Sequence, residues 1–337
     1  MGLTDMKRAL ITGINGFAGS HLADLLLQLG WKVHGTVRSF RSDLNNLDDA
    51  RALHPNKMVL HACDILDQKA VDEAISAAKP THIFHLAAQS YVPASWQAPG
   101  ATLDVNVKGT LHLLEAMRRL APNAKMQVAG TSEEYGVVTP SECPITEDQP
   151  LRPMSPYGVS KVAADVLTRQ YVASYGLRCV VTRAFNHSGA RRGKVFAESD
   201  WARQIAQAEA NGDARVVVRH GNLSAIRDMT DVRDIVRGYI AACDRGTSGM
   251  VYNLCSGRSQ SPTMRDILQR LANRSVIGVV LEKDEARMRP SDVPRLIGDN
   301  ARAKRDLKWS PQIPLASALE SLLLYWRSVL HATGPKK

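Results

Sequence analysis

The fold is decided by a stretch near the N-terminus, ALITGINGFAG at residues 9–19. Residues 9–11 form an apolar run that is typical of a buried strand, and leucines then recur at helical spacing from Leu22 to Leu29, ahead of Gly30. A strand that passes through a glycine-rich turn into a helix is the opening unit of a parallel α/β sheet.

The same alternation of strands and helices continues along the chain. We expect further strands at 32–37, 58–61, 81–86, 125–129, 178–182 and 251–254, with helices between them, for example at 110–120 and 159–175. This order predicts an α/β fold with a Rossmann-type, doubly wound parallel sheet. The pattern loosens after Phe185. We therefore expect a Rossmann domain at 1–185, with 228–256 returning to it, and a smaller interleaved C-terminal domain made of 186–227 and 257–337.

Composition narrows the classes of function. The 337 residues include 43 Lys and Arg against 33 Asp and Glu, and the net charge of +10 favours an acidic partner. There is no basic block or zinc-finger spacing, so we expect a phosphorylated small molecule and no nucleic acid. The five cysteines form no C-x-x-C pair, and no apolar run approaches the roughly 18 residues of a membrane span. These features predict a cytoplasmic protein with no membrane association and no bound metal.

The glycine loop predicts a nucleotide cofactor. Gly13 permits the tight turn, Gly16 lets backbone N–H groups approach a pyrophosphate, and Gly19 allows close packing of helix on strand. A purely structural glycine-rich turn is the alternative reading. The loop residues expected to contact the cofactor are Gly13, Asn15, Gly16, Phe17 and Ala18.

The ends of the next strands indicate which cofactor binds. An acidic residue after the second strand would hold the ribose hydroxyls of NAD, but this chain has Arg38, which suits the 2′-phosphate of NADP. A solvated basic loop is the alternative. After the third strand we expect Asp64 and Ile65 to flank the adenine, and after the fourth we expect a nicotinamide contact from Leu86, Ala87 and Ala88.

A second group predicts the chemistry. Tyr157 and Lys161 lie one helical turn apart, so both face the same way. A lysine there can lower the pKa of the tyrosine, which can then exchange a proton with a sugar hydroxyl while hydride moves to the nicotinamide. Thr131, just after the fifth strand, can hydrogen-bond the same oxygen. Tyr-x-x-x-Lys alone is common by chance, and only its position downstream of the glycine loop makes it specific.

Together these motifs resemble the extended short-chain dehydrogenase/reductase group, within the NAD-dependent epimerase/dehydratase family. Within that family the chain is most similar to the GDP-mannose 4,6-dehydratases and the GDP-4-keto-6-deoxymannose reductases. The segments that carry the resemblance are 85–91, 131–133, 155–161, 185–187, 191–193, 221–222, 227–228 and 289–290.

The two activities are favoured by different residues. Thr131-Ser132-Glu133 resembles the dehydratase signature, in which the glutamate is the base, whereas 151–156 and 251–257 resemble the reductases. Ala190 replaces a proline that both groups share. A 4,6-elimination needs a carboxylate beside C5 and C6 of the sugar, and we expect Glu133 on the same side as Thr131 if the strand end stays extended. The site therefore favours a dehydratase, with a reductase or a 4-epimerase as the alternatives.

The resemblance implies an NADP-dependent lyase of nucleotide-sugar metabolism and polysaccharide biosynthesis. Its substrate would be GDP-mannose or GDP-manno-heptose, converted to a GDP-4-keto-6-deoxy sugar by internal hydride transfer from C4 to C6 through NADP. A homodimer or homotetramer is also implied. The catalytic residues would be Thr131, Glu133, Tyr157 and Lys161, and His187 and Arg192 would join the cofactor contacts. The expected substrate contacts are Ser90, Asn186, Arg192, Asn222, Arg227 and Arg289.

Overall fold

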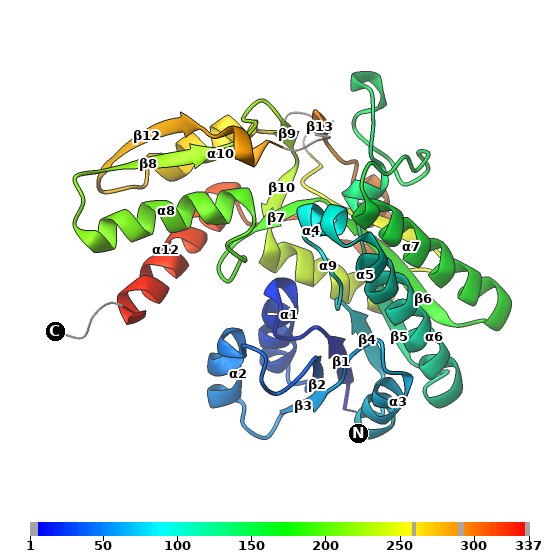
Figure 1. The fold of residues 1–337 in the computed structure, drawn as a ribbon. Coiled ribbons are helices and arrows are strands. Elements are labelled where there is room, and N and C mark those ends of the chain that lie inside the picture. The colour runs from blue at the N-terminus through cyan, green and yellow to red at the C-terminus, as the bar shows by residue number, and fades with distance from the viewer. Residues whose placement is uncertain (1–5, 258–260, 289–292, 334–337) are drawn as a thin grey trace.

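The computed structural model describes residues 6–257, 261–288 and 293–333. Within these residues the largest sheet has seven parallel strands in the order β11-β6-β5-β4-β1-β2-β3. The order reverses beside β1, as in a doubly wound sheet (Figure 1). The strands are β1 (Arg8–Thr12), β2 (Lys32–Val37), β3 (Met58–Ala62), β4 (His82–His85), β5 (Lys125–Thr131), β6 (Arg178–Ala184) and β11 (Val251–Leu254).

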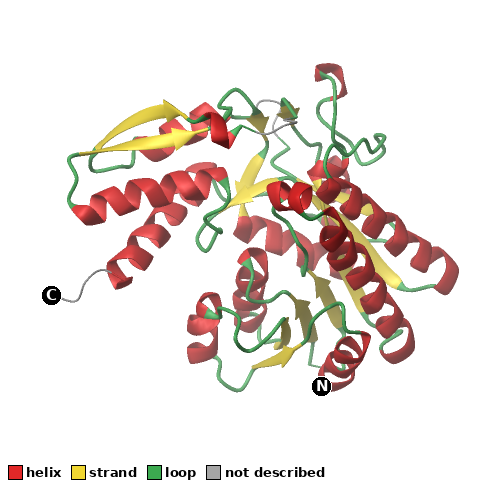
Figure 2. Cartoon of the chain, viewed as in Figure 1, coloured by secondary structure: helices red, strands yellow, loops and turns green. Residues whose placement is uncertain are grey.

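Helices cover both faces of this sheet (Figure 2). Because successive strand residues point to opposite faces, Ala9 and Ile11 of β1 join one hydrophobic cluster and Leu10 joins the other. The first cluster includes α1 (Phe17–Gln28), α2 (Asp48–Leu53), α9 (Val232–Arg245) and α11 (Ala301–Leu307). The second includes α3 (Gln68–Ala78), α6 (Gly109–Leu120) and α7 (Pro156–Tyr175).

A smaller layer of helices and short strands lies beyond the carboxyl ends of the sheet, at upper left in Figure 1. Its helices α8 (Ala197–Asn211), α10 (Met264–Ala272) and α12 (Leu315–Thr333) share a third hydrophobic cluster. Three short parallel pairs accompany them: β8 (Arg215–His220) with β12 (Gly278–Lys283), β7 (Asn186–Ser188) with β10 (Met229–Asp231), and β9 (Ile226–Arg227) with β13 (Arg295–Leu296). The segment after β4 forms α4 (Val92–Gln97) and α5 (Pro99–Leu103).

The expected fold class is confirmed, and the elements expected in the main sheet differ from the structure at their ends. The fifth strand continues to Thr131, two residues past its expected end, and the expected helix at 159–175 begins at Pro156. The helix starts early because the Ser155 hydroxyl accepts a hydrogen bond from the Gly158 amide at 3.0 Å and a proline suits the first helical position. Tyr157 is therefore fixed in the first turn of α7. None of the helices in the described ranges is both long and apolar enough to cross a membrane.

Candidate active site

A cavity of about 810 Å³ opens at the carboxyl ends of the central strands. It is bordered by the glycine loop, by the ends of β2 to β6, and by the first turn of α7. Every expected cofactor contact and every expected catalytic residue lines it, together with Ser90 and Asn186 from the expected substrate contacts. Parallel α/β sheets place their ligand sites at this edge, close to the point where the strand order reverses.

The glycine loop packs closely against neighbouring backbone. Gly13 has φ +70°, and a Cβ there would lie 3.0 Å from the Cα of Ala87. A Cβ on Gly19 would lie 2.3 Å from the carbonyl oxygen of Gly13, so only glycine allows this helix–strand contact. Gly16 caps α1 without any side-chain hydrogen bond. The first amides of α1 thus face the cavity without a capping side chain, which is the arrangement that binds a phosphate.

Arg38 lies at the rim of the same cavity, immediately after β2, with its side chain exposed. Asn15 donates a hydrogen bond to the Asp43 carbonyl at 2.9 Å, and Asn46 donates one to the Asn15 carbonyl at 3.0 Å. These bonds tie the glycine loop to the segment that follows Arg38. The two segments expected to contact the cofactor, the glycine loop and the residues after β2, are therefore held together by the chain's own hydrogen bonds.

The turn after β5 corrects the expectation of an extended strand end. Residues 132–134 form a 3-10 helix, capped by the Thr131 hydroxyl, which accepts a hydrogen bond from the Glu133 amide at 3.3 Å. The Glu133 side chain still borders the cavity with Thr131, but it does so because the chain turns. Serine, threonine and acidic residues favour such a capped turn over a longer strand.

Burial controls the protonation of the tyrosine–lysine pair. It raises the pKa of Tyr157, against the lowering effect of a hydrogen bond with Thr131. Desolvation therefore outweighs any lowering of the Tyr157 pKa by Lys161, whose ammonium donates to the Ala129 carbonyl at 2.8 Å. Burial also lowers the pKa of Lys161 to about 8. This lysine can lose or regain a proton near neutral pH, which suits a group that assists proton transfer.

Arg192 lines the cavity and packs against aromatic rings. Its guanidinium carbon lies 3.5 Å from the ring centroid of Phe196 and 5.0 Å from that of Phe17, and its Nε donates to Glu198 at 3.3 Å. The Phe17 ring also stacks on His187 with centroids 5.7 Å apart. Burial lowers the pKa of His187 to about 4, so the neutral ring donates from Nδ1 to the Phe185 carbonyl at 2.9 Å.

The expected substrate contacts fall into two groups. Asn186 lines the cavity, and its buried Oδ1 has no hydrogen-bond partner within the described part of the chain. Asn222 and Arg227 lie outside the cavity lining: Asn222 Oδ1 accepts from the Ser224 amide at 2.9 Å, and Arg227 Nη1 donates to the Val293 carbonyl at 2.7 Å. Arg289 lies outside the described residues. The structure thus brings Ser90, Asn186 and Arg192 together, but not Asn222 or Arg227 with them.

Sequence reasoning missed several residues at this site, among them Tyr239 and Glu134. Tyr239 of α9 is 3% exposed and lines the cavity, but it follows the tyrosine–lysine pair by some eighty residues and belongs to no recognisable motif. Glu134 accepts a hydrogen bond from the Thr131 amide at 2.8 Å and so fixes the turn that carries Glu133. A capping-box pattern, Thr131 followed three residues later by Glu134, was the signal that could have identified it.

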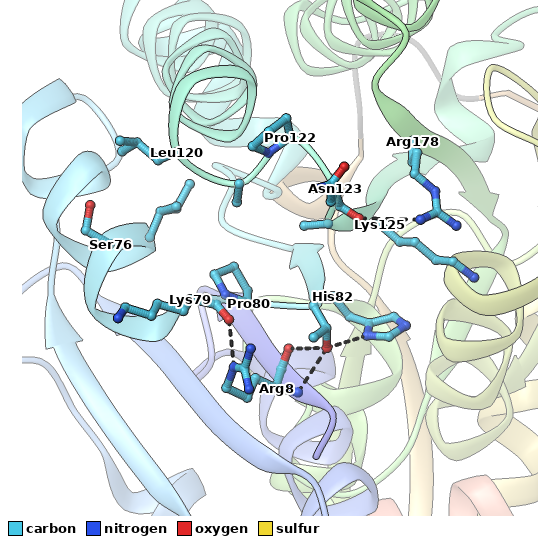
Figure 3. A pocket seen from close by; sticks show the side chains of 14 residues that line it. Arg8, Ser76, Lys79, Pro80, His82, Leu120, Pro122, Asn123, Lys125 and Arg178 are labelled. Carbon is cyan, nitrogen blue, oxygen red and sulfur yellow. Dashed lines mark hydrogen bonds between the residues drawn. The ribbon is translucent and has the colours of Figure 1, made fainter. Parts of the chain in front are cut away.

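A second hollow lies at the opposite edge of the sheet, where the strands begin (Figure 3). Arg8, Lys79, Lys125 and Arg178 give it a basic lining. The cations do not converge: Lys79 and Lys125 extend toward opposite sides of the hollow (Figure 3), and Lys125 donates to the Asp244 carbonyl at 2.6 Å. This hollow therefore lacks the convergent polar groups that mark a ligand site.

A family model described as GDP-mannose 4,6 dehydratase matches residues 10–322. The chain belongs to the GDP-mannose 4,6 dehydratase family. A GDP-6-deoxy-D-mannose reductase from Pseudomonas aeruginosa is 32% identical over 96% of this chain and 98% of its own. A GDP-mannose 4,6-dehydratase from Vibrio cholerae is 33% identical over 94% of this chain and 92% of its own. The family resemblance is confirmed, but relatives with two different activities are almost equally similar.

Solved structures agree with the fold. The structure of RMD from Pseudomonas aeruginosa complexed with NADPH superposes with a TM-score of 0.77 at 29% identity, over 96% of this chain and 100% of that one. The UDP-glucose 4-epimerase of Thermotoga maritima, solved with UDP-glucose, gives a TM-score of 0.84 at 26% identity, over 96% and 99% of the two chains. Members of the wider group that share this architecture therefore include both reductases and epimerases.

Proposed function

We propose that this chain is a GDP-sugar 4,6-dehydratase that uses NADP and acts on a GDP-linked manno-type sugar, either GDP-mannose or GDP-manno-heptose. The observation that carries the proposal is that Glu133 borders the same cavity as Thr131, Tyr157 and Lys161. A reductase or an epimerase needs the last three residues but has no step that requires a carboxylate base. Family membership supports a nucleotide-sugar substrate, and the relatives' names supply the GDP group.

The cavity fits a dinucleotide cofactor. The uncapped first turn of α1 would hold the pyrophosphate, and Arg38 would pair with a 2′-phosphate. Asp64 and Ile65 line the same cavity and would flank the adenine, and Leu86 to Ala88 would flank the nicotinamide. When bound, the nicotinamide supplies the acceptor for the hydrogen that leaves C4 and returns to C6.

The chain's own residues then perform the proton transfers. Tyr157, hydrogen-bonded to Thr131, removes the proton of the C4 hydroxyl, and Lys161 balances the charge. The resulting ketone acidifies the C5 proton, which Glu133 takes and then delivers to the departing C6 hydroxyl, so that water leaves. As hydride returns to C6, C5 takes up a proton that originates from solvent, while Tyr157 releases the proton it accepted from the C4 hydroxyl. Arg192 pairs with the diphosphate, and its packing on Phe196 fixes the direction of the guanidinium. The Asn186 amide supplies a polar contact to the substrate from the cavity wall.

A second candidate, reduction of a GDP-4-keto-6-deoxy sugar, is favoured by a specific observation. The reductase from Pseudomonas aeruginosa is similar to this chain over nearly the whole length of both proteins. In that reaction Glu133 would orient the substrate, and each turnover would consume one NADPH.

One experiment separates the two candidates. The purified protein is incubated with GDP-mannose and, separately, with GDP-manno-heptose in deuterated water without added reductant, and the products are weighed. A dehydratase yields a product lighter by one water, with deuterium at C5. A product from only one of the two sugars would also identify the substrate. Stoichiometric NADPH oxidation with a GDP-4-keto-6-deoxy sugar, and no dehydration of either substrate, would establish the reductase instead.

The variant Glu133→Gln tests the residue that carries the proposal. It should abolish elimination while leaving Thr131, Tyr157 and Lys161 in place, so NADPH absorbance should build up on the enzyme after substrate is added. Glu282→Gln, on β12 and paired with Arg219 at 3.7 Å, is the matched control and should behave like the wild type. Unchanged dehydration by Glu133→Gln would remove the basis of the assignment.

The proposal also assigns a different ligand to each of the two parts of the chain. We propose that residues 1–185 with 228–256 bind the cofactor, and that 186–227 with 257–337 bind the nucleotide sugar. Two features support this division: β11 extends the main sheet, and α8, α10 and α12 share a separate hydrophobic cluster.

A further inference from the structure

Two structural elements supply the four proposed catalytic residues. Thr131 and Glu133 belong to the turn after β5, which contains the 3-10 helix Ser132–Glu134. Tyr157 and Lys161 belong to α7. Efficient proton transfer requires these two elements to keep a fixed distance and orientation. A buried network centred on Glu134 joins them.

Glu134 holds the turn from within. Its Oε1 accepts a hydrogen bond from the Thr131 amide at 2.8 Å, and the Thr131 hydroxyl accepts one from the Glu133 amide at 3.3 Å. The two bonds close a capping box around the turn. The Glu134 side chain is fully buried, whereas that of Glu133 borders the cavity. Glu134 therefore fixes the backbone that positions the Glu133 side chain at the cavity.

The same carboxylate is anchored to α7 through an arginine. Arg183 of β6 donates from Nε to Glu134 Oε2 at 2.9 Å and from Nη2 to Asp165 Oδ2 at 2.8 Å. Asp165 lies on α7 one helical turn after Lys161. The side chains of Glu134, Arg183 and Asp165 are exposed by 0%, 3% and 0%. Charge-assisted bonds in so dry a setting are strong and directional, so they hold the turn and α7 in one arrangement.

The neighbouring backbone is shaped for this carboxylate. A Cβ on Gly130 would lie 2.5 Å from Glu134 Oε1, so any larger residue at that position would displace the side chain. From these contacts, and on the basis of the proposed function, we propose that Glu134 is a positioning residue. It holds Thr131 and Glu133 in register with Tyr157 and Lys161 without touching the substrate.

The chain carries a matched control for this proposal. Thr139 and Glu142 form a second capping box on a 3-10 helix, Pro140–Glu142, in which Glu142 Oε2 accepts from the Thr139 amide at 2.7 Å. Glu142 Oε1 also accepts from an arginine, Arg152, at 2.6 Å. This cap has the same chemistry but lies outside the cavity lining.

The test compares Glu134→Leu and Glu134→Gln with Glu142→Leu and Glu142→Gln. For each variant, kcat and KM are measured with the GDP-sugar, NADPH affinity by fluorescence, and exchange of the Thr131 amide by hydrogen-exchange mass spectrometry. Glu134→Leu should lower kcat by about 10- to 100-fold through misplacement of the reacting groups, with NADPH affinity unchanged. Glu134→Gln keeps an oxygen for the Thr131 amide and should recover much of that loss. The Glu142 variants should keep wild-type kcat.

Several outcomes would overturn the inference. A folded Glu134→Leu protein with wild-type kcat would do so, as would equal losses in the Leu and Gln variants. If Glu134→Leu does not fold, Gly130→Ala provides the second test, because its Cβ displaces Oε1; wild-type kcat in that variant would contradict the proposal. If the wild type converts no GDP-sugar, the proposed function has failed. Hydrogen exchange at the Thr131 amide then tests the positioning role without any activity measurement. Equal protection of this amide in Glu134→Gln, Glu134→Leu and the wild type would refute that role.

Discussion

Lys161→Met should make the protein more stable at pH 7 while removing its activity. Lys161 is 8% exposed, and burial lowers its pKa from 10.5 to about 8. A downward shift of this size disfavours the folded state by about 3 kcal/mol at pH 7, because each pKa unit corresponds to about 1.4 kcal/mol. Methionine fills a similar volume without a charge. The lost bond to the Ala129 carbonyl removes about 1 kcal/mol of this gain, which leaves a net stabilisation of about 2 kcal/mol.

The pH dependence of the gain identifies its cause. Between pH 8 and 10.5 the unfolded chain holds a proton on Lys161 that the folded chain has lost, so the stability of the wild type rises with pH in that window. The penalty is complete below about pH 8, falls to less than half by pH 9.5, and vanishes above 10.5. The advantage of Lys161→Met should therefore be largest at pH 7 and shrink as the solution becomes alkaline.

Urea denaturation at pH 7 and 9.5 measures this difference directly. It is carried out without added cofactor, since a ligand that binds only the folded wild type would mask the effect. Lys304→Met, at an exposed position on α11, is the control and should shift the midpoint at neither pH. If Lys161→Met is no more stable than the wild type at pH 7, or if its advantage is the same at both pH values, desolvation of the lysine is not the cause.

The remaining predictions concern single side chains. Tyr157→Phe should lower turnover by about 10²- to 10⁴-fold with cofactor affinity retained, and near-normal turnover would contradict its role as the proton carrier. Arg38→Asp should weaken NADP binding and shift preference toward NAD; titration showing that the wild type binds both equally would refute the 2′-phosphate contact. Arg183→Leu should destabilise the fold by about 3–5 kcal/mol, because Glu134 and Asp165 stay buried without their shared cation. That loss should lessen as the pH falls and the carboxylates take up protons, and denaturation at pH 5 and 8 checks it.

Local periodicity was sufficient to predict the main sheet. The glycine loop, the strand at 32–37 and the strand at 251–254 were placed from apolar runs and turn residues alone, because buried parallel strands differ clearly from the helices between them. The expected α7 began three residues late, since proline and glycine at 156 and 158 break the apolar pattern although a serine cap starts the helix there. Element ends depend on single hydrogen bonds, which periodicity does not report.

The site was predictable where function requires a local motif. Tyr157, Lys161 and the glycine loop each have a fixed spacing along the chain, so their approach in space follows from the fold. Tyr239 reaches the cavity only through the packing of α9 on α1, a long-range contact that no spacing encodes. The pKa of Tyr157 could not be foreseen either, because its direction depends on burial and not on the charge of Lys161 one turn away.

The cavity contains buried cationic side chains, Lys161 and Arg192, whose desolvation is unfavourable for folding. Burial lowers the pKa values of both Lys161 and Arg192, so holding positive charge in this cavity destabilises the fold. The two charges are partly compensated: Lys161 donates to the Ala129 carbonyl, and Arg192 donates to Glu198 at 3.3 Å and packs on Phe196. An anionic ligand would complete that compensation, since opposite charge favours the protonated form of each group. The same desolvation that destabilises the fold therefore strengthens its attraction for phosphate-bearing ligands, so stability and binding at this site oppose each other.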